Sequence, residues 1–153
     1  MVSATHLGSP VDVRVPLPSS PDYAESLDAF KRWAIASHGP NHTPTIIQLC
    51  HSGRQSMRAS GRPFFEPSKA PSAVGMVAGS GWIGKLIGEV VWGTPSEMTL
   101  EDIQEVIEGF VQGARVAKAA GFEGIQIHAS HGYLIAQWLS PNVSDLLGVA
   151  RPY

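Results

Sequence analysis

Several features that define particular protein classes are scarce in this sequence. Cys50 is the single cysteine in 153 residues, which excludes an internal disulfide framework and a zinc site built from several thiolates. No apolar run approaches the roughly 20 residues of a membrane helix, and the N-terminus lacks the basic start and apolar stretch of a signal peptide. We therefore expect a cytoplasmic protein that does not bind membranes.

Charge of one sign is also scarce. The chain carries 11 basic and 13 acidic residues, a formal net charge of −2, and no long run of either sign. This pattern gives no electrostatic footprint for nucleic acid or an anionic membrane. The composition, 43% hydrophobic and 16% charged, is that of an ordinary globular protein. Small molecules are the expected partners.

Turn-forming residues divide the first third of the chain into strands and a helix. Residues 11–15 alternate valine with charged residues, which predicts a short edge strand between prolines. Ser20 is expected to be the N-cap of a helix that ends at Gly39-Pro40. The β-branched run at 43–49 then predicts a strand buried on both faces, as in a parallel sheet.

The rest of the chain continues this alternation. Residues 51–93 are rich in Gly, Ser and Pro without a sustained period, which indicates a long loop of the kind that is either functional or disordered. Thr99 is the expected N-cap of a second helix, Gly121 follows its end, and a strand is predicted over 122–128. Because a (β/α)8 TIM barrel takes about 250 residues, we expect an α/β fold that forms a partial barrel of about three strands and two main helices.

Polar residues follow the two clearest strands. In parallel α/β folds such positions lie on one face and carry the catalytic groups. Gln48 ends the first strand, and its amide could pair with a planar heterocycle such as a flavin pyrimidine, or could be a buried amide bonded to neighbouring backbone. His51 and Arg54, just beyond it, fit either a site or a solvated loop.

The second strand ends in His128, His131 and Tyr133, which indicate a carbonyl-activating site. Two neutral imidazoles can hold a developing oxyanion, and a phenol with a pKa of about 10 can protonate a carbanion-like carbon. Two alternatives remain. The histidines could cap the strand end while Tyr133 packs sideways, or His51, His128 and His131 could bind zinc, although neither cluster contains an acid and no HExxH pattern occurs.

Two motifs resemble the old yellow enzyme family of NADH:flavin oxidoreductases. IIQLCHSGRQS resembles that family's strand with Gln-Leu, His and Gly-Arg, and AAGFEGIQIHASHGYLIAQWLSPN resembles its strand with His-x-x-His-Gly-Tyr-Leu and Ser-Pro-Asn. The resemblance runs from about residue 1 to Asn142. It implies a partial FMN-binding TIM-barrel domain over 1–142, followed by a divergent C-terminal tail over 143–153.

The resemblance also implies a function. Such an enzyme binds FMN, takes reducing equivalents from NADH or NADPH, and reduces the activated C=C bond of an enone-type substrate, an α,β-unsaturated carbonyl compound. By position, Gln48 would bind the flavin pyrimidine, His128 and His131 would bind the substrate carbonyl, and Tyr133 would protonate the α-carbon.

The chain departs from the family pattern at several points. The family's first strand, a later arginine that faces the flavin and the phosphate-binding loops have no counterpart here, and Gln126 stands where the family usually has an acid. The alternative hypothesis is therefore a non-catalytic remnant or partial subunit that needs another chain or self-association. We expect the isolated chain to be weakly active at best.

Overall fold

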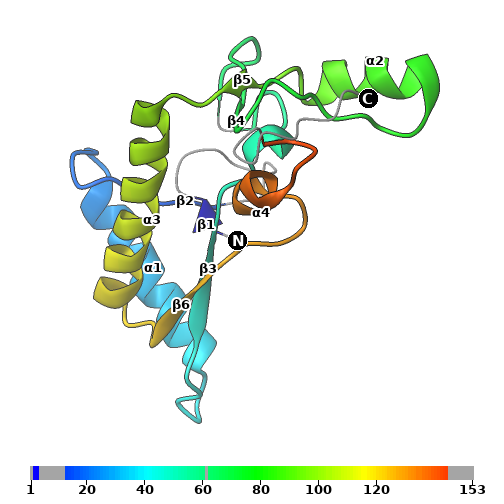
Figure 1. Ribbon diagram of the computed structural model, residues 1–153. Coiled ribbons are helices and arrows are strands. Elements are labelled where there is room, and N and C mark those ends of the chain that lie inside the picture. The colour runs from blue at the N-terminus through cyan, green and yellow to red at the C-terminus, as the bar shows by residue number, and fades with distance from the viewer. Residues whose placement is uncertain (1, 4–12, 61, 145–153) are drawn as a thin grey trace.

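A four-stranded parallel sheet forms the centre of the computed structural model, which describes residues 2–3, 13–60 and 62–144 (Figure 1). Its strand order is β2-β1-β3-β6, and every neighbouring pair is parallel. The strands are β1 (Val2–Ser3), β2 (Val13–Arg14), β3 (Ile46–Cys50) and β6 (Gly124–Ile127). The predicted α/β fold with a parallel sheet is confirmed, and β1 is an additional strand.

The remaining elements are helices and one small second sheet. Strands β4 (Lys69–Ala70) and β5 (Ser96–Glu97) pair in parallel. The helices are α1 (Tyr23–His38), the 3-10 helix η1 (Gly53–Gln55), α2 (Gly81–Val91), α3 (Leu100–Ala120) and α4 (Leu134–Leu139). In the described part of the chain, no helix is long and apolar enough to cross a membrane.

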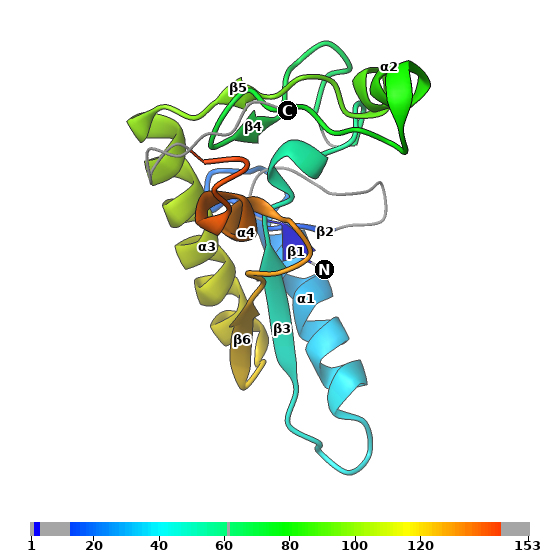
Figure 2. The same cartoon turned by 45° about the vertical axis from the view of Figure 1, so that its right-hand side comes forward.

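Helices α1 and α3 cover one face of the sheet, while the opposite face carries no helix in the described residues (Figure 2). The core lies between these layers because Ile47 and Leu49 of β3 point toward the helices. The other buried members of this core are Val15, Phe30, Ala34, Val116, Ala117, Ala120 and Phe122. Because side chains alternate along a strand, Gln48, between Ile47 and Leu49, points to the uncovered face.

Helix α3 begins and ends where the sequence predicts. The Thr99 side chain accepts a hydrogen bond from the Asp102 N–H, and the Asp102 carboxylate accepts one from the Thr99 N–H, which is a complete capping box. Gly121 ends the helix in the left-handed conformation with φ 97°. The chain then enters β6 within three residues, so α3 and the strand that follows are tightly connected.

Three local predictions need correction. Helix α1 begins at Tyr23, not beside Ser20, because residues up to Asp22 form turns in which the Ser20 carbonyl accepts from the Tyr23 N–H. Strand β3 begins at Ile46, so 43–45 are not part of it. The segment 51–93 contains α2, whose glycines hid its helical period. Of the predicted strand at 11–15, β2 forms at Val13–Arg14, and 11–12 lie outside the described residues.

Candidate functional site

The two polar strand ends meet at the same end of the sheet. Strands β3 and β6 are adjacent, with Gln48 opposite Gln126 and Leu49 opposite Ile127. The His128 N–H donates to the Leu49 carbonyl at 2.8 Å, which continues the pairing beyond β6. The loops that follow both strands lie at the upper end of the sheet, next to α4 and η1 (Figure 1). The predicted convergence of the two clusters is therefore present.

Gln48 lies half-buried on the uncovered face of the sheet. Its Nε2 donates to Oε1 of Gln126 at 2.8 Å, across the β3–β6 ladder. The hydrogen-bond partner of the Gln48 side chain is thus a side chain on the neighbouring strand. The alternative interpretation had assumed a bond to nearby backbone. Because side chains alternate along a strand, Gln126 and His128 share this face, roughly 7 Å apart along the strand direction.

His128 and His131 form a pair at the end of β6. Nδ1 of His131 lies 3.2 Å from Nε2 of His128, and the Ser130 hydroxyl lies 3.3 Å from Nδ1 of His128. His128 is buried, whereas His131 is exposed and has a left-handed backbone with φ 55°. Burial first, and the neighbouring His131 charge second, lower the pKa of His128. The His128 imidazole is therefore neutral near pH 7 and acts as a hydrogen-bonding group.

Tyr133 lies at the start of α4, where its N–H donates to the Ser130 carbonyl at 3.1 Å. Its ring meets the His128 ring edge-on, with centroids 5.1 Å apart and planes at 89°. The three residues singled out from the sequence are thus brought together, with the phenol beside the buried imidazole. The same contact also agrees with one part of the alternative in which these residues have a structural role, because Tyr133 packs sideways against His128.

His51 and Arg54 are not the solvated loop residues that one interpretation allowed. His51 is 1% exposed, and its Nδ1 accepts from the Gly53 N–H at 3.0 Å. Arg54 is partly buried, and its guanidinium donates to the Val74 carbonyl at 3.4 Å. Both residues shape the turn after β3, because their bonds hold η1 and the following loop in place.

Gln137 of α4 joins the two loops, a role that sequence reasoning missed. The side chain is 1% exposed. Its Nε2 donates to the carbonyls of Ser52 at 3.1 Å and Gly132 at 2.7 Å, and its Oε1 accepts from the Arg54 N–H at 3.2 Å. The residue lies within the second motif, but a glutamine in an apolar helical stretch carries no signal of which distant backbone it will bond.

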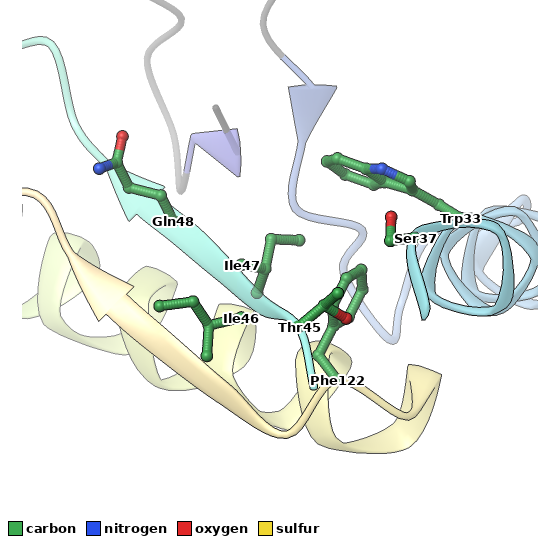
Figure 3. Close-up of a pocket in the computed structure, with 7 residues that line it drawn as sticks. All are labelled: Trp33, Ser37, Thr45, Ile46, Ile47, Gln48 and Phe122. Carbon is green, nitrogen blue, oxygen red and sulfur yellow. The ribbon is translucent and has the colours of Figure 1, made fainter. Parts of the chain in front are cut away.

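One cavity of about 470 Å³ lies lower along β3, away from the histidines. Its lining residues are Trp33, Ser37, Thr45, Ile46, Ile47, Gln48 and Phe122. Figure 3 shows Trp33 and Ser37 projecting from α1 toward β3, with Gln48 on the strand itself. Gln48 is the one predicted site residue on this lining. None of His128, His131 and Tyr133 lines this cavity.

The same histidines bear on the zinc alternative. Within residues 2–3, 13–60 and 62–144, no group of three or more His, Cys, Asp or Glu side chains is arranged to hold a metal ion. The three histidines weighed as ligands do not form such a group there.

Comparison with known proteins gives the family. The sequence profile of the NADH:flavin oxidoreductase / NADH oxidase family matches residues 25–146. The chain is 41% identical over 140 residues to the NADH-dependent flavin oxidoreductase iliE of Neonectria sp., covering 91% of this chain and 18% of that protein. It is 42% identical over 142 residues to iccE of Talaromyces variabilis, described by the same activity, covering 91% of this chain and 33% of that protein.

A solved structure supports the partial barrel. An old yellow enzyme homologue from Zymomonas mobilis superimposes with a TM-score of 0.71 at 24% identity, over 94% of this chain and 37% of that one. The chain thus spans about a third or less of the length of these proteins. FMN, with NADH or NADPH as reductant, is the cofactor set that the family implies. The chain belongs to the NADH:flavin oxidoreductase / NADH oxidase family.

Proposed function

We propose that this chain carries part of the flavin and substrate site of an FMN-dependent oxidoreductase that reduces the activated C=C bond of α,β-unsaturated carbonyl compounds. The observation that carries the proposal is the placement of Gln48 beside the His128, His131 and Tyr133 cluster, on adjacent parallel strand ends. This is the end of a parallel α/β fold where ligands bind.

Gln48 has the chemistry to hold the pyrimidine edge of FMN. An amide has two N–H donors and an oxygen with two lone pairs. The bond from Nε2 to Gln126 uses one donor, which leaves an N–H and a carbonyl oxygen for a ring edge that offers both an acceptor and a donor. When bound, FMN supplies the hydride chemistry that protein side chains lack.

The histidine pair would bind and polarise the substrate carbonyl. A neutral imidazole has one N–H that it can donate to a carbonyl oxygen, and His128 stays neutral because burial lowers its pKa. Nδ1 of His131 and Nε2 of His128 lie 3.2 Å apart, so this contact has to open for both residues to donate to the substrate. Such donors stabilise negative charge that develops on the oxygen when the β-carbon gains a hydride. Tyr133, beside His128, would then donate its phenolic proton to the α-carbon. A neutral His128 is a weak proton donor. Binding of the carbonyl and protonation of the α-carbon therefore fall to different residues.

The isolated chain presents a sheet edge that a partner could complete. Strand β6 ends the described strand order, and its Ile125 and Ile127 are 38% and 52% exposed. Unpaired edges and exposed apolar residues favour association. The alternative function is therefore that of a partial subunit or non-catalytic remnant, active only with a complementing chain. We place either form in the cytoplasm, which agrees with its single, buried cysteine.

The direct test is the visible absorption spectrum of the purified chain after mixing with FMN and desalting. Retention near one flavin per chain is expected if the site is assembled. Gln48→Leu should then lose flavin, while Gln104→Leu, the same change at an exposed glutamine of α3, should retain it. A colourless wild-type protein would contradict flavin binding by the isolated chain and would favour the partial-subunit alternative.

The catalytic assignment needs a second measurement, made on flavin-loaded protein. With 2-cyclohexenone as probe, Tyr133→Phe should slow reoxidation of reduced flavin about a hundredfold or more, the usual contribution of general acid catalysis. Reduction of the flavin by NADH or NADPH should stay unchanged, since it needs no proton at the α-carbon. Equal rates of reoxidation in both proteins would remove Tyr133 from the mechanism.

A further inference from the structure

Helix α2 packs against the protein through its smallest residues. Gly84 and Gly88 are its buried positions. A Cβ at Gly88 would come within 2.0 Å of the Met76 carbonyl oxygen, and one at Gly84 within 2.7 Å of the Ala78 carbonyl oxygen. No other residue type fits this approach, because the helix lies directly on the backbone of 76–79.

The opposite side of α2 presents bulky apolar side chains to solvent. Their exposed fractions run from 44% for Ile87 to 74% for Trp82. At 3.6 residues per turn these side chains fall within about 140° of one another around the axis. We call them the α2 stripe: Trp82, Ile83, Leu86, Ile87 and Val90. A soluble protein rarely leaves such a surface without a partner.

The α2 stripe is held in place by contacts on its flanks. Arg58 donates from its backbone to the Val91 carbonyl at 2.9 Å and from its guanidinium to Glu89 at 3.0 Å. Thr94 donates to the other Glu89 oxygen at 3.0 Å, and Arg62 donates to the Trp92 carbonyl at 3.0 Å. These bonds fix the C-terminal turn of α2 to residues of the preceding loop and to Thr94, so the stripe is held in a defined position there.

An aromatic pair extends this surface. The Arg58 guanidinium that bonds Glu89 also lies over the Phe64 ring, 5.2 Å from its centroid. Phe65 meets Phe64 edge-on with centroids 5.1 Å apart, and is 88% exposed. Arg58 thus connects this aromatic pair to Glu89 of α2, which places a second exposed apolar group near the stripe.

We propose that the α2 stripe is a homodimer interface, in which α2 packs antiparallel against α2 of a second copy of this chain. A stripe made only of apolar side chains is complementary to an identical stripe, and a twofold contact requires such self-complementarity. Five side chains that expose on the order of 100 Å² each leave roughly 500 Å² per chain, and two copies would bury about 1,000 Å², the lower size of a specific interface. The proposal goes beyond flavin chemistry and does not depend on it.

The charges of α2 select the antiparallel arrangement. Lys85 and Glu89 lie on one flank of the stripe, and Lys85 is exposed while the Glu89 side chain is 55% exposed. A twofold axis at the level of Ile87 brings Lys85 of each copy opposite Glu89 of the other, which makes two attractive pairs. A parallel twofold arrangement would place this charged flank against the opposite, uncharged flank of the partner helix, so these attractive pairs would not form.

The first experiment measures mass in solution by light scattering across micromolar concentrations. We expect a dimer of about 33 kDa, twice the 16.3 kDa of the chain. Leu86→Glu and Val90→Glu should each raise the dimer Kd about tenfold or more. Ile35→Glu, the same change at an α1 residue that is 70% exposed, should leave the dimer intact. A monomer at all concentrations, or a dimer that survives both α2 substitutions, would overturn the proposal.

The second experiment tests the orientation by disulfide formation under mild oxidation. In the antiparallel dimer the two copies of residue 86 lie near the axis, so Leu86→Cys should cross-link. The two copies of residue 90 lie roughly 10 Å apart along the helices, beyond disulfide reach, so Val90→Cys should not. Equal cross-linking at both positions would indicate parallel helices. The natural Cys50 is 0% exposed and should stay reduced.

Besides a second copy or a complementing chain, a membrane surface could cover the α2 stripe, and the wild-type protein alone distinguishes the membrane from the dimer. We would mix the wild-type chain with vesicles of phosphatidylcholine and phosphatidylglycerol and sediment them. Wild-type dimer that remains in the supernatant supports the proposal. Monomer that sediments with the vesicles, and loses this binding in Leu86→Glu, would replace the proposal with a lipid interface.

Discussion

Gln137 provides the sharpest test of how the two loops of the site are held. Replacing it by leucine keeps the approximate size of the side chain and removes its polar atoms. The amide is 1% exposed, so no water replaces the lost partners. The substitution leaves the carbonyls of Ser52 and Gly132 and the N–H of Arg54 without these bonds.

The cost can be worked out from these three contacts. Both carbonyls keep a second donor, the Gln55 N–H at Ser52 and the Gln55 side chain at Gly132, so each lost bond costs its net value of about 1 kcal/mol. Burial of the added apolar surface offsets part of the total of about 3 kcal/mol, so we expect a net loss near 2 kcal/mol in the free energy of unfolding. With a urea m-value of about 2 kcal/mol per molar, the midpoint of unfolding should fall by roughly 1 M.

The assay is urea denaturation followed by tryptophan fluorescence, with Gln104→Leu as the matched control. Gln104 is exposed and bonds to Glu108 at 3.2 Å on the same helix. Its substitution should change stability by less than about 0.5 kcal/mol. If Gln137→Leu unfolds at the same urea concentration as this control, then the buried amide does not tie the loops together and the reasoning fails.

Three further outcomes are expected. Gln126→Leu removes the acceptor that orients the Gln48 amide, so the affinity for FMN should fall roughly fivefold, about 1 kcal/mol. Gln126→Glu keeps an acceptor and should bind FMN more tightly than the leucine variant in the same titration. The Thr45 N–H first, and the His38 side chain to a lesser degree, hold the pKa of Glu123 below its ordinary 4.5, so this stabilisation is present above pH 4.5 and disappears as pH falls through the lowered pKa. Glu123→Gln should therefore melt below wild type at pH 7, and the difference in melting temperature should narrow as the pH falls further below 4.5. A difference that stays constant into acid would contradict the assignment. Thr99→Ala should lose about 1 kcal/mol of stability, which Thr99→Ser should largely restore in thermal denaturation.

Local signals predicted the second helix better than the first. The capping box at Thr99 and the glycine at 121 are self-contained, since each cap forms with residues fewer than five positions away. The Ser20 prediction failed because a serine followed by proline and an acid also suits turns, and the chain uses them as turns up to Asp22. Helix α2 was missed because Gly84 and Gly88 interrupt its apolar pattern, and their role depends on a backbone that lies against them.

The sequence by itself determined which residue types stand at the strand ends, because the order of strands and helices predicts a parallel sheet whose polar ends share one side. Gln48, His128, His131 and Tyr133 followed from that rule and from the motifs. Only the tertiary structure decided their partners. The pairing of Gln48 with residue 126 depends on strand register, and the Gln137 bonds depend on how α4 docks between two loops. Such contacts join residues about 80 positions apart, so no local pattern specifies them.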